Sequence, residues 1–247
     1  MTKILSGLLL LVCAVRLQAT SVVVFRTPTG IVLGADDGKQ TISGEKADTK
    51  PTMKQSLCKI RQAGRWWTAQ TGFDDVGNVD IYQSIANVVS GTRSLDEAAL
   101  ALQERAFPLF NQLVAARPRA FRTLQPIHGV AIAGTNLGDS TLRVGWLVVY
   151  VAADQPGHVT AGWNQCPGPW CEPGGGGLLH FTTGVEPALS LVKPPRPDWV
   201  EAADAAAAMK LIQLQHTAKP NSVGPGADVL ELSGSGPHWA KRAACTQ

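Results

Sequence analysis

The chain has few of the features that mark nucleic-acid-binding, metal-binding or cofactor-binding proteins. Its 247 residues carry a formal net charge of only +3, which gives no reason to expect a nucleic acid or an anionic membrane as partner. The five histidines are scattered without HxH or HxxxH pairs, and the CxxC spacing of zinc ribbons is absent, so no metal is expected. The glycine run at 174–177 is not followed by Lys-Ser or Lys-Thr, so no phosphate-binding loop or other cofactor site is predicted.

Long hydrophobic runs are absent too, except at the start of the chain. Lys3 precedes an apolar segment from Ile4 to Val15, and Ala19 is a small residue at a suitable cut site. This pattern is typical of a removable signal peptide, and the segment is too short to span a membrane comfortably. We expect cleavage after Ala19, with a cut after Ala14 and an uncleaved anchor as the alternatives. The mature protein is therefore expected to be soluble, without a membrane partner, and secreted or periplasmic.

Removal of residues 1–19 lowers the formal net charge from +3 to +1, because two basic residues and no acid are lost. The remaining length suits one domain, which we place at residues 20–233. The tail at 234–247 is expected to be loosely ordered.

Four cysteines remain after the predicted cleavage, which permits disulfides in an exported protein. Cys166 and Cys171 bracket a short loop and are the expected pair. Cys58 is interpreted as a small apolar strand residue rather than a nucleophile. Trp66 and Trp67, on one predicted strand, are expected to point to opposite faces, one into the core and one outward.

The predicted elements come in the order strands, two helices, strands, helix, strand. This segregated order indicates an α+β fold rather than alternating βαβ units. The turn at 27–30 predicts an opening hairpin, and Ser94 with Glu97 forms a capping box. Strands are predicted at 21–25, 31–35, 57–60, 65–69, 128–133, 142–151, 159–163, 178–183 and 229–232, and helices at 76–89, 94–118 with a break at Pro108, and 198–217.

Thr20 would become the N-terminal residue after the predicted cleavage. It would then carry a hydroxyl nucleophile and a free α-amine, whose pKa of about 8 leaves a useful fraction neutral at physiological pH. This is the pattern of the N-terminal threonine nucleophile. Asp36 follows sixteen residues later, at the end of the hydrophobic strand from Gly30. The simpler interpretations are a chance residue after a signal cut for Thr20 and a turn residue for Asp36.

The sequence resembles a known family in four segments. These are Thr20-Ser21-Val22-Val23-Val24, Gly30-Ile31-Val32-Leu33-Gly34-Ala35-Asp36, Cys58-Lys59-Ile60 and Thr71-Gly72. Together they resemble the proteasome β-subunit and HslV branch of the N-terminal nucleophile (Ntn) hydrolases. The resemblance implies a four-layer αββα sandwich of two antiparallel sheets flanked by helices. It also implies threonine peptidase activity on a peptide or other amide substrate, and assembly into a homo-oligomer.

The resemblance assigns roles to five residues. Thr20 would be the nucleophile, Asp36 the carboxylate that holds a lysine, and Lys59 that lysine. Lys54 is the alternative lysine, because Lys59 lies about seven residues later than the family spacing requires. Gly72 would contribute to the oxyanion hole. Ser222 is the candidate for a late serine that helps position the N-terminal amine.

The sequence also departs from the family pattern. Val185 stands where the family usually has a serine, and the late Asp-x-x-Ser-Gly-Gly motif is replaced by the segment from Pro220 to Gly226. These departures keep two alternatives open. One is a catalytically inactive binding or assembly protein, and the other is an Ntn amidase acting on a small molecule.

Overall fold

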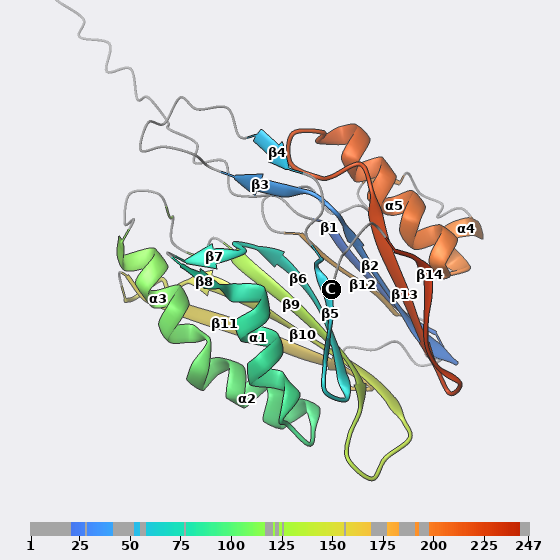
Figure 1. The fold of residues 1–247 in the computed structure, drawn as a ribbon, viewed down its shortest axis with the longest axis horizontal. Coiled ribbons are helices and arrows are strands. Elements are labelled where there is room, and N and C mark those ends of the chain that lie inside the picture. Colours follow the sequence, from blue (N-terminus) through green and yellow to red (C-terminus); the bar gives the residue numbers. More distant parts are fainter. Residues whose placement is uncertain are drawn as a thin grey trace, which may run out of the picture.

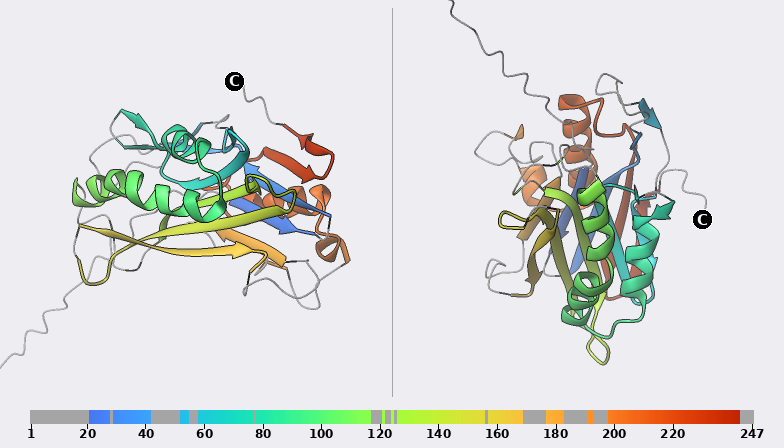
Figure 2. Two further views of the ribbon diagram at one scale, coloured as in Figure 1. Left: turned by 90° about the horizontal axis from the view of Figure 1, so that it is seen from below. Right: turned by 90° about the vertical axis from the view of Figure 1, so that its left-hand side faces the viewer.

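Two five-stranded antiparallel sheets pack face to face, with helices on both outer sides (Figures 1 and 2). The predicted fold class, a four-layer α+β sandwich, is thus confirmed. The computed structural model describes residues 21–27, 29–41, 52–54, 58–76, 78–116, 121, 124, 126–155, 157–168, 177–182, 191–192 and 198–242.

The first sheet contains both ends of the described chain and has the order β12-β1-β2-β13-β14. The predicted opening hairpin is confirmed, because β1 and β2 pair in the register Val22 with Ala35. The β13 strand then pairs with the other edge of β2, with Ala227 opposite Asp36. Its strands are β1 (Ser21–Arg26), β2 (Gly30–Asp36), β12 (Gly177–Thr182), β13 (Ala227–Ser233) and β14 (Gly236–Lys241).

The second sheet has the order β11-β10-β9-β6-β5 and carries the middle of the chain. Two short two-stranded ribbons stand outside the sheets. The strands of the second sheet are β5 (Ile60–Ala63), β6 (Trp66–Gly72), β9 (Pro126–Thr135), β10 (Leu142–Val151) and β11 (Val159–Cys166). The ribbons are β3 (Lys39–Thr41) with β4 (Thr52–Lys54), and β7 (Asp75–Val76) with β8 (Val79–Asp80).

Helices α1 (Ile81–Ser90), α2 (Leu95–Arg105) and α3 (Phe107–Ala116) cover the second sheet. The first starts later than predicted, because the Asp80 side chain accepts from the Gln83 amide and caps it. The predicted cap of the second is confirmed, since the Ser94 hydroxyl accepts from the Glu97 amide. The break near Pro108 is also confirmed, and this proline sits in the first turn of α3, where it is tolerated.

The predicted helix at 198–217 is two helices, α4 (Asp198–Glu201) and α5 (Ala205–Ala218). The chain breaks at Ala203, which has a positive φ of 50°. Asp204 then caps α5 by accepting from the Ala207 amide. The longer helix, α5, lies against the outer face of the first sheet (Figure 1).

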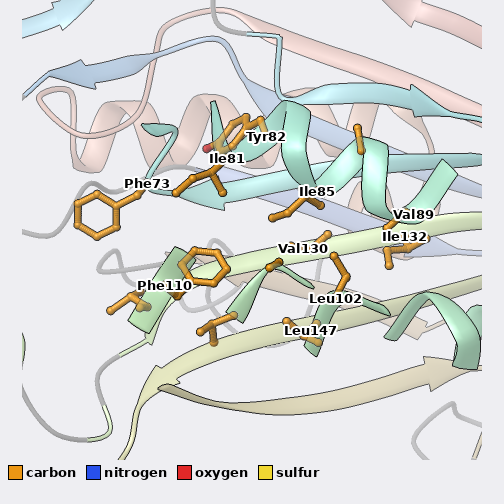
Figure 3. Packing of buried hydrophobic residues seen from close by; sticks show 14 of the residues in the cluster. Phe73, Ile81, Tyr82, Ile85, Val89, Leu102, Phe110, Val130, Ile132 and Leu147 are labelled. Atoms are coloured by element: carbon orange, nitrogen blue, oxygen red, sulfur yellow. The ribbon is translucent and has the colours of Figure 1, made fainter. Parts of the chain in front are cut away.

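Three hydrophobic cores correspond to the three interfaces of the sandwich. The first lies between α1–α3 and the second sheet (Figure 3), the second between the two sheets, and the third between the first sheet and α5. Trp66 is in the first core and Trp67 in the second. The prediction that one of these tryptophans points outward is therefore wrong, because both faces of β6 are covered.

The prediction of a loosely ordered tail after residue 233 is also wrong for residues 236–241. They form β14, which pairs with β13 as the edge strand of the first sheet. Trp239 on this strand makes an edge-to-face contact with Trp67, at a centroid distance of 5.8 Å. This aromatic contact stabilises the edge strand β14. From the sequence alone, the same residues resemble a polar tail.

His128 is a buried polar residue within the first core. It lies against the rings of Tyr82 and Phe110, at centroid distances of 5.7 and 4.9 Å. Within the described part of the chain neither ring nitrogen has a hydrogen-bond partner. Burial lowers the pKa of His128 to about 3, and the nearby Phe73 backbone opposes this shift without reversing it.

We predict that His128 makes the protein acid-labile. The pKa of this histidine is about 6.5 in an unfolded chain, so below that pH the unfolded state binds a proton that the folded state does not. The free energy of unfolding therefore does not change with the titration of His128 above about pH 6.5. It falls by up to about 1.4 kcal/mol per pH unit as the pH drops from about 6.5 toward 3. Denaturant unfolding between pH 7.5 and 4.5 should show a shallower pH dependence for His128→Leu than for the native protein. The exposed His238→Leu should keep the native slope, and equal slopes for all three proteins would contradict the prediction.

Candidate active site

Asp36, at the end of β2, is completely buried and has four hydrogen-bond donors. Its Oδ1 accepts from the Ser21 backbone nitrogen at 2.7 Å and from the Lys59 ammonium at 2.8 Å. Its Oδ2 accepts from the backbone nitrogens of Gly38 at 3.0 Å and Gly224 at 2.7 Å. A buried carboxylate is costly unless it is paired and hydrogen-bonded, and these donors meet that requirement.

Lys59 immediately precedes β5, and its ammonium crosses from the second sheet to Asp36 in the first. The side chain of Lys59 is 1% exposed, and its backbone oxygen accepts from the Gln70 amide of β6 at 3.2 Å. Burial lowers the pKa of Lys59, and the nearby carboxylate of Asp36 opposes this shift. Of the two lysines considered from the sequence, Lys59 is the one that contacts Asp36; the side chain of Lys54 lies outside the described residues.

The loop between α5 and β13 reaches the same carboxylate through its backbone. Gly224 donates to Asp36, and the neighbouring Asp37 accepts from the Gly226 amide at 2.9 Å. A side chain at Gly226 would collide with the Asp37 carboxylate. Ser222, expected from the sequence to help position the N-terminal amine, is half-buried in this loop. The contact with Asp36 is made by Gly224 instead, which no side-chain motif could have indicated.

Gly72 ends β6, at the end of the second sheet where Lys59 precedes β5. Its φ of +97° favours glycine, and an added Cβ would collide with the Ile127 carbonyl. The preceding Thr71 is fully buried, and its hydroxyl has no hydrogen-bond partner in the described structure. Because Trp67 and Ala69 of β6 lie in the core between the sheets, the strand alternation places the Thr71 side chain on that face too.

Cys58, next to Lys59, is disulfide-bonded, as is Cys166. The interpretation of Cys58 as a simple apolar strand residue is therefore wrong, since its sulfur forms a covalent cross-link. Cys171, the expected partner of Cys166, lies outside the described residues. A bonded sulfur is not a free thiolate, which excludes Cys58 as a nucleophile in this state.

Thr20 and Val185 both lie outside the described residues. Among the residues that are described, no group of three or more His, Cys, Asp or Glu side chains could hold a metal ion. None of the helices in the described ranges is long and apolar enough to cross a membrane.

We predict that Asp36→Ala destabilises the protein by about 3–5 kcal/mol, the usual cost of leaving one member of a buried ion pair unpaired. The substitution leaves the Lys59 ammonium and three backbone donors without their acceptor. The loss should appear in denaturant unfolding at pH 7. Asp139→Ala is the matched control, because it breaks the partly exposed pair with Arg143 and should cost far less. Similar losses in both variants would show that Asp36 does not have the structural role assigned to it.

Comparisons with known proteins match the chain at the level of fold. No protein-family model matches it, and no curated protein does. Among solved structures, Anbu (ancestral beta-subunit) from Yersinia bercovieri is 14% identical, with a TM-score of 0.52 over 90% of this chain and 87% of that one. A mutant of Anbu from Hyphomicrobium sp. strain MC1 is also 14% identical, with a TM-score of 0.45 over 90% of this chain and 85% of that one.

These findings correct the family assignment suggested by the sequence. The expected place in the proteasome β-subunit and HslV branch is wrong, because no family model matches and a structural neighbour, an ancestral β-subunit, is only 14% identical. An identity this low carries fold information only. The chain has the proteasome-like Ntn fold.

Proposed function

We propose that this chain is an exported hydrolase that cleaves amide bonds, with peptides as the expected substrates, through an acyl-enzyme on Thr20. One observation carries the proposal. The backbone nitrogen of Ser21, the atom that joins Ser21 to Thr20, donates to the same Asp36 oxygen that holds the Lys59 ammonium. The start of β1 is thereby tied to a buried carboxylate–lysine pair.

Cleavage after Ala19 would complete the site by creating the base. The Thr20 oxygen attacks the substrate carbonyl carbon, and its proton passes to the α-amine directly or through one water. The carbon–nitrogen bond of the substrate then breaks, and the leaving nitrogen takes that proton. Water attacks the resulting ester with the same amine as base, and the threonine oxygen recovers a proton as the acid product leaves.

Lys59 and Gly72 have supporting roles in this proposal. A positive charge at Lys59 favours the ionised threonine oxygen and the neutral α-amine, because it repels protonation nearby. Gly72 would donate its backbone N–H to the developing oxyanion, a contact that needs preorganised donors. The Gly72 conformation supports this role, since its positive φ fixes an unusual direction for the peptide at the end of β6.

The alternatives remain a catalytically inactive assembly protein and an amidase of small molecules. The first is favoured by the sequence, because Val185 stands where the family usually has a serine and the late Asp-x-x-Ser-Gly-Gly motif is not matched. In that case the chain would retain its leader or be cut elsewhere, and self-association would be its main property. Self-association itself stays a prediction, which sedimentation of the mature protein would test.

We predict that the exported protein begins at Thr20 and that Thr20→Ala abolishes labelling by a β-lactone probe. The threonine oxygen would bond to the lactone carbonyl carbon, the ring carbon–oxygen bond would break, and the ring oxygen would take the proton. Intact mass fixes the N-terminus, and peptide mapping locates the label. Thr20→Ser keeps a hydroxyl and should still be labelled. A mature chain that begins at Val15, or labelling that survives Thr20→Ala, would refute the proposal.

A further inference from the structure

Gln215 is a buried polar side chain on an otherwise apolar helix face. It is fully inaccessible to solvent. The other buried residues of α5 are Ala205, Ala207, Ala208, Leu211 and Ile212. An amide in such a place costs free energy unless it is hydrogen-bonded, so its partners indicate what it does.

The Oε1 atom of Gln215 accepts a hydrogen bond from the Ser21 hydroxyl. Ser21 is itself fully buried, and its side chain lies on the face of β1 that carries Val23 and Phe25 toward α5. Its backbone nitrogen is held separately by Asp36 at 2.7 Å. Ser21 is therefore fixed through both its backbone and its side chain, by two residues 179 positions apart in the sequence.

The C-terminal end of α5 also positions the loop that donates to the second oxygen of the Asp36 carboxylate. The Nδ1 atom of His216 lies 2.7 Å from the Val223 carbonyl oxygen, and the Val223 amide donates to Lys219. These contacts hold the loop whose next residue, Gly224, donates to Asp36. One helix end thus fixes both the start of β1 and the backbone donor opposite it.

We propose that Gln215 is a positioning residue: through the Ser21 hydroxyl it fixes the start of β1, the strand that Thr20 immediately precedes in the sequence. This inference rests on the proposed function, because it concerns the placement of the nucleophile. Asp36 holds Ser21 through its backbone nitrogen alone, whereas Gln215 adds a second contact through the side chain. Reacting groups must be held close to the productive geometry, and a misplacement of about 1 Å costs about a hundredfold in rate.

The test measures the rate of β-lactone labelling at Thr20 in the mature protein, as a maximal rate and a half-saturating concentration. Gln215→Met keeps the side-chain length but removes the acceptor. Its maximal rate should fall about tenfold, within the range expected for a misplaced reacting group, while the half-saturating concentration stays unchanged. Gln213→Met makes the same substitution on the exposed face of α5 and should label at the native rate.

A second pair of variants tests the contact from its other end. Ser21→Val and Ser21→Thr have the same shape, but only threonine retains the hydroxyl donor. Ser21→Val should lose labelling rate about as much as Gln215→Met, and the double variant no more than either, because residues in one contact are not additive. Ser21→Thr should stay within about twofold of the native rate, the scale on which single contacts vary with context. If Gln215→Met does not fold, the difference in labelling rate between Ser21→Val and Ser21→Thr tests the inference.

Two results would overturn the inference without touching the proposed function. One is native labelling that depends on Thr20 and is unchanged in both Gln215→Met and Ser21→Val. The other is a lower unfolding temperature in these variants with a native labelling rate below that temperature, which would make the contact structural only. By contrast, absence of labelling in the native mature protein would overturn the proposed function, and the inference with it.

Discussion

The buried carboxylate of Asp36 is the interaction on which the arrangement of the site depends. It joins four segments that are distant in the sequence: the start of β1, the turn after β2, the residue before β5, and the loop before β13. Three of the four donors are neutral backbone amides, so the carboxylate is satisfied while only one positive charge is buried with it. These hydrogen bonds hold the two sheets and the loop after α5 in fixed positions relative to one another, at one end of the sandwich.

The Asp36–Lys59 pair is better understood as a constraint on geometry than as a source of stability. Burying both charges carries a desolvation cost that their attraction offsets only when the geometry is good and the remaining lone pairs are hydrogen-bonded. The lowered pKa of Lys59 reflects that cost, since burial outweighs the nearby carboxylate. A protein that needed stability alone would do as well with apolar residues at both positions.

Much of this arrangement was predictable from local sequence patterns, and the rest depends on long-range contacts. The β1–β2 hairpin, the Ser94 cap and the position of Asp36 follow from alternation, turn residues and spacing. The contacts of Gly224 and Gln215 do not, because they connect positions 188 and 194 residues from their partners, and one of them uses only backbone. The strand β14 was missed because its residues are mostly exposed, and its pairing with β13 comes from the hairpin rather than from burial.

The proposed chemistry places two amines beside one carboxylate, and this has a consequence for how they titrate. If Thr20 is exposed by processing, its α-amine would belong to the residue next to Ser21, whose nitrogen shares an Asp36 oxygen with the Lys59 ammonium, and protonation of one amine would lower the pKa of the other. Such groups titrate as a pair, so neither apparent pKa belongs to one residue alone. The negative charge of Asp36 favours protonation of one of the two amines, whereas burial of Lys59 disfavours protonation of both. In the proposed chemistry, the balance between these two effects decides whether a neutral amine is available as the base.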